Sequence, residues 1–240
     1  METWKLEPAR DLGLPIKQRW RSLRRESGLV EAGFQAAWWA LVHGYLSVGH
    51  RLRFLGRENL PAEPPFVLIA NHVSHLDALV LTCSLNWRLR DRAFPIAAGD
   101  TFFDKTPQAA FAAGLLNALP LWRHKAGSHS LSELRDRLMQ QPCVYILFPE
   151  GTRSRNGEMA PFKPGLGLLV AQTNVPVVPC YLDGTFESLP PHRRWPRFRK
   201  ITVRIGEPLQ FTHAINEKAG WQEVVRGAEK AVRKLAMSSQ

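Results

Sequence analysis

The sequence is poor in cysteine, in acidic residues and in long hydrophobic runs, and each shortage excludes a class of protein. Its 240 residues contain three cysteines, Cys83, Cys143 and Cys180. They are too few and too scattered for a disulfide framework, and they form no Cys-x-x-Cys pair. Each lies in or beside an apolar run, which is typical of a buried thiol in a reducing compartment.

No apolar run is long enough for a simple membrane span. In the most apolar stretch, Gly28–Val48, the longest unbroken run is Ala36–Val42, whereas a spanning helix needs about 20 mostly apolar residues. Seven Lys and Arg side chains lie within residues 1–25, but no apolar core follows at once, so we expect no cleaved signal peptide. Apolar residues at helical spacing instead predict an amphipathic helix: Phe34, Trp38, Leu41, Val42 and Tyr45. Such a helix either lies in the membrane interface or packs on the protein's own core.

Acidic residues number 21 against 32 Lys and Arg, which gives a net charge of +11. This excess favours an anionic partner, and nucleic acid, a phospholipid surface and a phosphorylated substrate all qualify. Apolar residues make up 45% of the chain and charged residues 22%, as in an ordinary globular protein. Disorder is therefore excluded as the main interpretation.

Short apolar runs alternate with helical stretches through most of the chain. The predicted strands are Phe66–Ala70, Phe94–Ala97, Leu119–Trp122, Cys143–Phe148, Val177–Leu182 and Ile201–Ile205. The predicted helices are Leu76–Trp87, Pro107–Leu116, Ser130–Gln140 (opened by a Ser130-x-x-Glu133 capping box), Gly165–Thr173 and Trp221–Ala236. This alternation predicts an α/β fold, a single domain with a mainly parallel mixed sheet flanked by helices.

A helical region that associates with the membrane interface is expected to precede this domain. We place this basic, aromatic region at residues 1–53 and the main domain at residues 54–240, with a C-terminal helix at residues 221–236. The segment Pro190–Lys200 is predicted to be a loop because it combines prolines with five basic residues.

The first chemical block, Asn71–Asp77, directly follows a predicted strand, where ligands bind in open α/β sheets. Asp77 lies early in the next helix, so its carboxylate is able to reach back to His72, fix the tautomer and make the imidazole a general base. The structural alternative is a helix-capping Asp beside a turn histidine. A metal site at His72, His75 and Asp77 is disfavoured because no other ligand cluster with recognisable spacing accompanies them. Ser74 lacks the surroundings of a nucleophile, and helix capping is its default role.

The second block, Phe148–Ser154, also follows a predicted buried strand. Gly151 permits a tight turn and close approach of backbone to ligand, and the planar guanidinium of Arg153 suits a phosphate. Glu150 is placed to accept from a substrate hydroxyl or to orient Arg153. The structural alternative is a solvated polar turn in which Glu150 and Arg153 pair with each other.

Two further cations fit the same picture. Arg123 ends the apolar run Leu119–Arg123, and Lys163 stands just before a predicted helix, whose N-terminus favours an anion. Together these strand-end loops predict a phosphate-binding site beside a general base.

These residues resemble the glycerolipid acyltransferase family, which contains the 1-acylglycerol-3-phosphate (lysophosphatidic acid) acyltransferases. The family's His-x4-Asp block is present at Asn71–Asp77, and its Phe-Pro-Glu-Gly-Thr-Arg-Ser block stands complete at Phe148–Ser154. A Val-Pro-Val-Val-Pro strand entry is complete at Val175–Pro179, and an apolar run ends in Arg at Leu119–Arg123, with Trp122 where an acidic residue is common. Order and spacing agree over a motif-bearing core of about residues 54–210.

The resemblance implies transfer of a fatty acyl group from a thioester, acyl-CoA or acyl-carrier protein, to a lyso-lipid hydroxyl. His72 would be the general base and Asp77 its orienting partner, with no metal and no resident cofactor. Backbone N–H groups near Gly151 are candidates for stabilising the oxyanion. The phosphorylated lyso-lipid acceptor would be bound by Arg123, Glu150, Gly151, Thr152, Arg153 and Lys163. The expected product is phosphatidic acid, and the expected location is peripheral or monotopic on the cytoplasmic face of an anionic membrane.

Other functions remain open from the sequence. Relatives use other lyso-lipids or hydroxyl acceptors, a hydrolase would release free fatty acid from the same thioester, and a catalytically silent module would only bind membranes. Basic and aromatic residues interleave at residues 192–200, which suits nucleic acid. No known nucleic-acid module accompanies them, and an anionic bilayer accounts for them as well, so nucleic acid is not expected as a partner.

Overall fold

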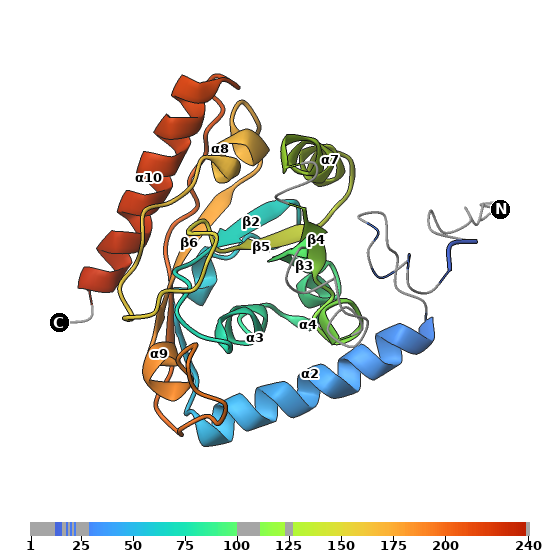
Figure 1. The fold of residues 1–240 in the computed structure, drawn as a ribbon, viewed down its shortest axis with the longest axis vertical. Helices are drawn as coiled ribbons and strands as arrows, with labels where there is room; N and C mark the ends of the chain where they lie inside the picture. The colour runs from blue at the N-terminus through green and yellow to red at the C-terminus, as the bar shows by residue number, and fades with distance from the viewer. Residues whose placement is uncertain are drawn as a thin grey trace.

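Within the part of the chain that the structure describes, a seven-stranded sheet has the order β1-β7-β6-β2-β5-β3-β4 (Figure 1). The structure, a computed structural model, describes residues 13–15, 18, 20, 22, 29–99, 111–122 and 127–238. Neighbouring strands run parallel except β6 and β7, so the mainly parallel mixed sheet is confirmed. The strands are β1 (Arg53–Leu55), β2 (Phe66–Ile69), β3 (Ala93–Ala98), β4 (Leu119–Leu121), β5 (Val144–Leu147), β6 (Val177–Asp183) and β7 (Thr202–Ile205).

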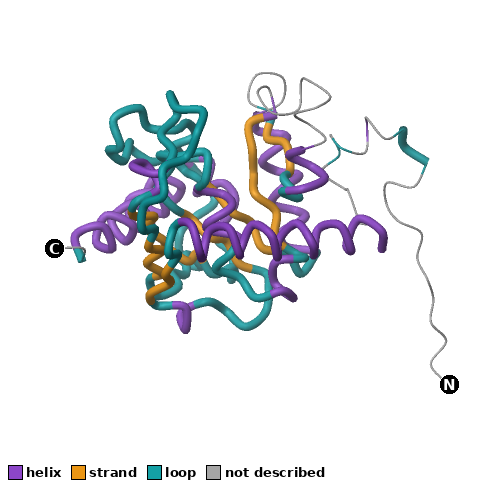
Figure 2. The backbone as a smooth tube through the Cα atoms, turned by 90° about the horizontal axis from the view of Figure 1, so that it is seen from below, coloured by secondary structure: helices purple, strands orange, loops and turns teal. Residues whose placement is uncertain are grey.

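Helices cover both faces of the sheet. On one face lie α7 (Gly127–Gln140), α8 (Gly165–Val170) and α10 (Lys218–Met237) (Figure 1). On the other lie α2 (Leu29–Gly49), α3 (Asp77–Thr82), α4 (Trp87–Arg90) and α9 (Thr185–Ser188), with α2 running along the whole of that side (Figure 2). A 3-10 turn at Arg57–Asn59 and a π-helical turn at Phe111–Leu115 complete the described elements.

Two hydrophobic clusters follow from the alternation of side chains along the central strands. In β2, Phe66 and Leu68 belong to the cluster beneath α2 and α3, whereas Val67 and Ile69 belong to the cluster beneath α7, α8 and α10. Successive strand residues point to opposite faces, and both faces here are covered by helices. The continuous apolar run of β2 is therefore fully buried.

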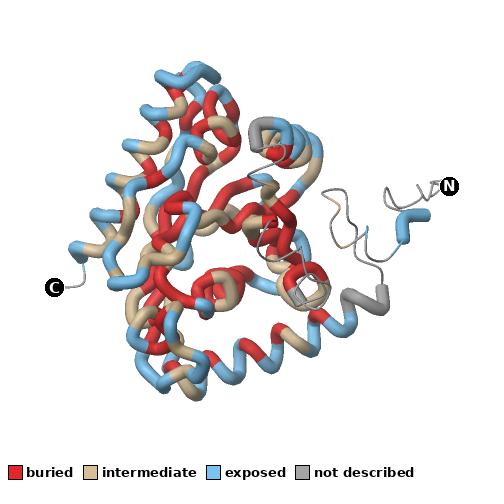
Figure 3. The backbone as a smooth tube through the Cα atoms, viewed as in Figure 1, coloured by how far each residue is buried: buried red, intermediate tan, exposed pale blue. Residues whose placement is uncertain are grey.

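The α2 helix packs on the core with one side only. Trp39, Val42 and Leu46 are buried in the cluster beneath it. The opposite side carries exposed apolar side chains that we call the α2 stripe: Phe34, Leu41, Tyr45 and Val48. Figure 3 shows the resulting alternation of buried and exposed segments along the helix. The predicted helix is confirmed, but its predicted apolar face is wrong: of the five residues expected to form that face, only Val42 is buried, because the helix packs through Trp39, Val42 and Leu46. Among the described residues no helix is long and apolar enough to cross a membrane.

Several predicted boundaries are wrong, each for a local reason. The helix predicted over Leu76–Trp87 ends at Thr82. A second helix, α4, starts at Trp87, where the Asn86 side chain accepts the Leu89 N–H (3.0 Å). Ser130 does not cap a helix, since α7 already begins at Gly127 and encloses it. The helix predicted over Gly165–Thr173 ends at Val170.

Short elements were missed, and one prediction falls partly outside the described residues. The strand β1 and the helix α9 were not predicted. Of the helix predicted over Pro107–Leu116, residues 107–110 lie outside the described residues, and a π-helical turn occupies Phe111–Leu115. The division proposed at residue 53 stays a prediction, and β1 spans it.

Candidate active site

A histidine and a carboxylate meet at the carboxyl end of β2. His72 Nδ1 lies 2.8 Å from Asp77 Oδ2, at the start of α3. A carboxylate is an acceptor, so Nδ1 carries the hydrogen, and Nε2 is left as the basic nitrogen. The His72 side chain is 22% exposed, whereas that of Asp77 is fully buried. The structure therefore presents a partly accessible imidazole whose tautomer is fixed from behind.

Asp77 is itself held by the backbone of its own block. The N–H groups of Val73 and Ser74 both donate to Asp77 Oδ2 at 2.7 Å. The Ser74 hydroxyl accepts from the Leu76 N–H (3.1 Å) and donates to the Leu189 carbonyl (2.7 Å). Ser74 is thus buried and fully engaged in the turn, which is a structural role and leaves no free nucleophile.

The residues around His72 lock its place on the sheet. The Asn71 side-chain amide accepts from the Leu182 N–H (2.8 Å) and donates to the Leu182 carbonyl (3.1 Å), so it extends the pairing of β2 with β6. The Phe148 ring stacks on the imidazole with centroids 4.2 Å apart and planes 16° apart. Neither role was predicted from the sequence, although Asn71 and Phe148 lie within two residues of the ends of β2 and β5.

Glu150 joins the two blocks from inside the protein. It is 1% exposed, and its oxygens accept from the backbone N–H groups of His72 (2.7 Å) and Ala160 (2.9 Å). Burial raises the pKa of Glu150, and the two backbone hydrogen bonds oppose that shift. In the other direction, the Ser154 N–H donates to the His72 carbonyl (2.8 Å). Both carboxylate oxygens of Glu150 accept from backbone N–H groups. This geometry fits a structural link between the two blocks better than a contact with substrate.

Arg153 lies against the histidine block rather than against Glu150. Its guanidinium contacts the ring of His75, three residues after His72. Arginine only donates, so the accepting imidazole is neutral. Burial lowers the pKa of His75, and the charge of Arg153 lowers it further. From the sequence, His75 was considered only as a metal ligand. In the structure its ring contacts Arg153 and so helps to position the guanidinium.

Lys163 and Gly151 are brought together as well. Gly151 adopts φ 72°, in the left-handed region that favours glycine, and a Cβ there would come within 2.9 Å of Lys163 Nζ. The Lys163 N–H donates to the Pro149 carbonyl at 2.9 Å. An exposed lysine therefore lies over the turn of the second block.

The remaining predicted residues are less closely tied to the histidine. Thr152 is exposed in the turn, and Arg123 lies outside the described residues. The Gly151 N–H donates to the Phe148 carbonyl at 2.9 Å, so this N–H stabilises the turn instead of an oxyanion. Trp122 packs over Gly99, where a Cβ would be 2.7 Å from the indole. Within the described residues, no three His, Cys, Asp or Glu side chains are grouped as metal ligands.

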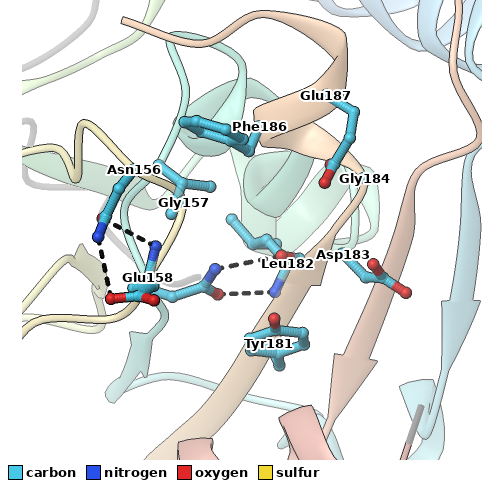
Figure 4. A pocket seen from close by; sticks show the side chains of 11 residues that line it. Asn156, Gly157, Glu158, Tyr181, Leu182, Asp183, Gly184, Phe186 and Glu187 are labelled. Atoms are coloured by element: carbon cyan, nitrogen blue, oxygen red, sulfur yellow. Dashed lines mark hydrogen bonds between the residues drawn. The ribbon is translucent and has the colours of Figure 1, made fainter. Parts of the chain in front are cut away.

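A pocket of about 270 Å³ lies on the β6 side of the histidine block (Figure 4). Asn71 and Val73 form one wall, and the rest comes from residues 156–158 and the end of β6 with α9. Its charged lining residues are carboxylates: Glu158, Asp183 and Glu187. Like charges repel, so this pocket does not suit a phosphate. The cations Arg153 and Lys163 are not among its lining residues.

The comparisons with known proteins agree with this arrangement. The Acyltransferase family model matches residues 51–183, which include both blocks. The chain belongs to the Acyltransferase family. The resemblance found in the sequence is thereby confirmed for the family as a whole.

Individual relatives in the family carry more specific names. The chain is 33% identical over 145 residues to 1-acyl-sn-glycerol-3-phosphate acyltransferase alpha of Mus musculus, covering 60% of this chain and 49% of that protein. It is 32% identical over 165 residues to the chloroplastic 1-acyl-sn-glycerol-3-phosphate acyltransferase BAT2 of Brassica napus, covering 65% of this chain and 44% of that protein. The chain thus matches about half the length of these curated relatives.

A solved structure shares the fold. It is the 1-acyl-sn-glycerophosphate (LPA) acyltransferase PlsC of Thermotoga maritima, with a TM-score of 0.67 and 23% identity. The match covers 87% of this chain and 80% of the other. This likeness supports the α/β architecture of the Acyltransferase fold in our chain.

Proposed function

We propose that the protein transfers a fatty acyl group from an acyl thioester to the hydroxyl of 1-acylglycerol-3-phosphate, giving phosphatidic acid. The observation that carries the proposal is the His72–Asp77 pair, 2.8 Å apart at the carboxyl end of β2, with cations on the adjacent turns. Family membership and the names of the relatives support the same reaction.

His72 acts as the general base in this proposal. Its Nε2 takes the proton of the acceptor hydroxyl while the oxygen attacks the thioester carbonyl carbon. The carbon–sulfur bond then breaks, and the departing thiolate recovers the proton from the imidazolium. Asp77 Oδ2, already bonded to Nδ1, stabilises that imidazolium and keeps Nε2 aimed outward. The step needs no metal and no covalent enzyme intermediate.

The acceptor phosphate is assigned to the side of the site where Arg153 and Lys163 lie. Arg153 offers a planar pair of donors, and Lys163 a mobile point charge over the Gly151 turn. The carboxylate-lined pocket beside the block repels a phosphate, and neither cation lines it. The donor, acyl-CoA or acyl-carrier protein, brings its own thioester.

A lipid acceptor places the reaction at a membrane, and the α2 stripe supplies an apolar surface for one. Phe34, Leu41, Tyr45 and Val48 follow one another at spacings of seven, four and three residues, so they lie within about 60° of one another around the helix. Phe34 is 72% exposed and Val48 84%. A helix with one buried and one exposed apolar side is suited to lie in the interface of a bilayer.

The test is acyl transfer by the purified full chain from labelled acyl-CoA, with and without 1-acylglycerol-3-phosphate. We expect labelled phosphatidic acid and free CoA in equal amounts, and only when the acceptor is present. Free fatty acid in its place would identify a hydrolase, and no reaction with acyl-CoA or acyl-carrier protein would identify a silent membrane-binding module. A panel of other lyso-lipids, run with the same donor, tests the choice of acceptor.

A further inference from the structure

The loop Pro190–Lys200, between α9 and β7, has a surface that neither the fold nor the proposed chemistry uses. It contains five basic residues and no acidic one. Trp195 is 81% exposed and Phe198 68% exposed. Large aromatic side chains so open to water within a basic loop point to a partner that is both apolar and anionic.

This loop lies against the C-terminal end of α2 (Figure 1). The Phe198 ring lies 6.2 Å from that of Tyr45 and 5.6 Å from that of His50, centroid to centroid. His50 Nδ1 donates to the Arg199 carbonyl at 3.2 Å, and the Ile201 N–H donates to the His50 carbonyl at 2.9 Å. Tyr45 belongs to the α2 stripe, so the apolar surface of the helix continues into the loop.

The same loop is attached to the histidine block. Ser74, two residues after His72, donates its hydroxyl hydrogen to the carbonyl of Leu189, the residue that precedes the loop. Within the loop, the Arg197 N–H donates to the Ser188 carbonyl at 2.7 Å, which folds the basic segment back towards α9. A surface bound by the loop would therefore lie next to the block that carries His72.

We infer that Pro190–Lys200 is a second contact with an anionic lipid bilayer, continuous with the α2 stripe, and that it holds the His72 block at the bilayer surface. The basic side chains attract anionic headgroups, and Trp195 and Phe198 are suited to the headgroup level. Single-stranded nucleic acid would also use basic and aromatic residues. It would leave the aliphatic part of the continuous surface, Leu41 and Val48, exposed to water, so the bilayer is favoured.

Binding to vesicles tests the inference without any substrate. Full-length protein is sedimented with sucrose-loaded vesicles of phosphatidylcholine containing phosphatidylglycerol. The double variant Arg194→Gln/Arg197→Gln should partition about 10- to 30-fold more weakly than the wild type. Arg226→Gln/Lys230→Gln removes the same charge from the exposed side of α10, across the sheet from the loop, and should bind like the wild type. Equal binding by both double variants would overturn the inference.

A second measurement places the loop in the bilayer directly. Brominated acyl chains quench tryptophan emission only at close range, so Trp195→Phe should lower the quenchable fraction while still binding vesicles. Trp221→Phe, on α10, should not lower it. Quenching unchanged by Trp195→Phe would show that the loop stays out of the bilayer. A short single-stranded oligonucleotide is titrated in parallel, and loop variants that lose only oligonucleotide binding would also overturn the inference.

The inference depends on the proposed function in one respect: it assumes that holding the His72 block at the bilayer surface serves acyl transfer. Binding of the loop to the bilayer does not depend on that function. A protein that binds vesicles through the loop yet transfers no acyl group would contradict the proposed function alone. A protein that transfers acyl groups, but whose loop variants bind vesicles normally, would contradict the loop inference alone.

Discussion

At the scale of single residues, Glu150 suits substrate binding by type, but in this structure its carboxylate is bonded to the protein's own backbone. Its two oxygens hold the N–H groups of His72 and Ala160, which lie on different loops. The resemblance assigned it to the acceptor, and that assignment stays a prediction that a substitution is able to test.

Glu150→Gln keeps the shape of the side chain but turns one acceptor oxygen into a donor that faces an N–H group. We expect the free energy of unfolding to fall by about 1–3 kcal/mol and kcat to fall with it. Glu158→Gln, on an exposed side chain in the same loop, should change stability by no more than about 0.5 kcal/mol. Urea unfolding and steady-state kinetics measure both. A raised acceptor KM at unchanged stability would instead support direct contact with substrate.

His75 gives the site a dependence on pH. Its pKa is lowered from 6.5 by burial and by Arg153, so the unfolded chain binds this proton more readily than the folded protein. The stability contributed by neutral His75 is therefore present above pH 6.5 and is lost as pH falls below that value. His75→Gln offers Arg153 an acceptor at every pH, so it should lose less stability between pH 7.5 and 5.5 than the wild type.

Thermal unfolding at the two pH values measures this difference. His129→Gln is the control, because the His129 side chain is 74% exposed on α7. The stability that His129→Gln loses between pH 7.5 and 5.5 should match the loss of the wild type. If His75→Gln loses as much stability between these pH values as the wild type, protonation of His75 does not affect the stability of the protein.

At the scale of elements, close packing between α8 and α10 contrasts with the open face of α2. A Cβ on Gly167 would overlap the backbone of Trp221, whereas a Cβ on Gly44 would meet nothing within 4 Å. Gly167→Ala should therefore lower the free energy of unfolding by about 1–3 kcal/mol or more, since α10 has to move. Gly44→Ala should raise it by about 0.5–1 kcal/mol, because alanine favours the helix. Urea unfolding of both variants checks this, and equal effects would contradict the packing.

The elements also show what sequence was able to predict. Strands such as β2 and β5 were located because both their faces are buried, which leaves an unbroken apolar run. The start of α4 depends on one side chain, that of Asn86, and β1 has only three residues, so neither left a periodic pattern.

In the site, the His72–Asp77 contact followed from spacing, since both residues lie in one block. The contacts of Glu150 and Arg153 could not be predicted in this way, because each residue reaches the histidine block across 78 positions of the chain. Long-range contacts of this kind are set by the order of strands in the sheet, which the local sequence does not encode.

At the scale of the whole molecule, basic residues gather in two places, to which the proposed function and the further inference assign different partners. Arg153 and Lys163 lie at the turn of the second block, where Arg153 contacts His75 of the first, on the side assigned to the phosphate. The loop Pro190–Lys200 carries further cations beside the α2 stripe. The proposed function and the further inference thus assign part of the +11 excess to a phosphorylated substrate and part to an anionic bilayer.

The central claim is that His72 is the base in acyl transfer, and its replacement by alanine tests that claim most directly. Transfer from acyl-CoA to 1-acylglycerol-3-phosphate is measured for the wild type and for His72→Ala, with circular dichroism and urea unfolding to establish that both are folded. The account predicts a fall in kcat of about 10²- to 10⁴-fold, since only the base is removed. A folded His72→Ala variant that turns over within about threefold of the wild type would contradict it, since general-base catalysis is worth far more than that.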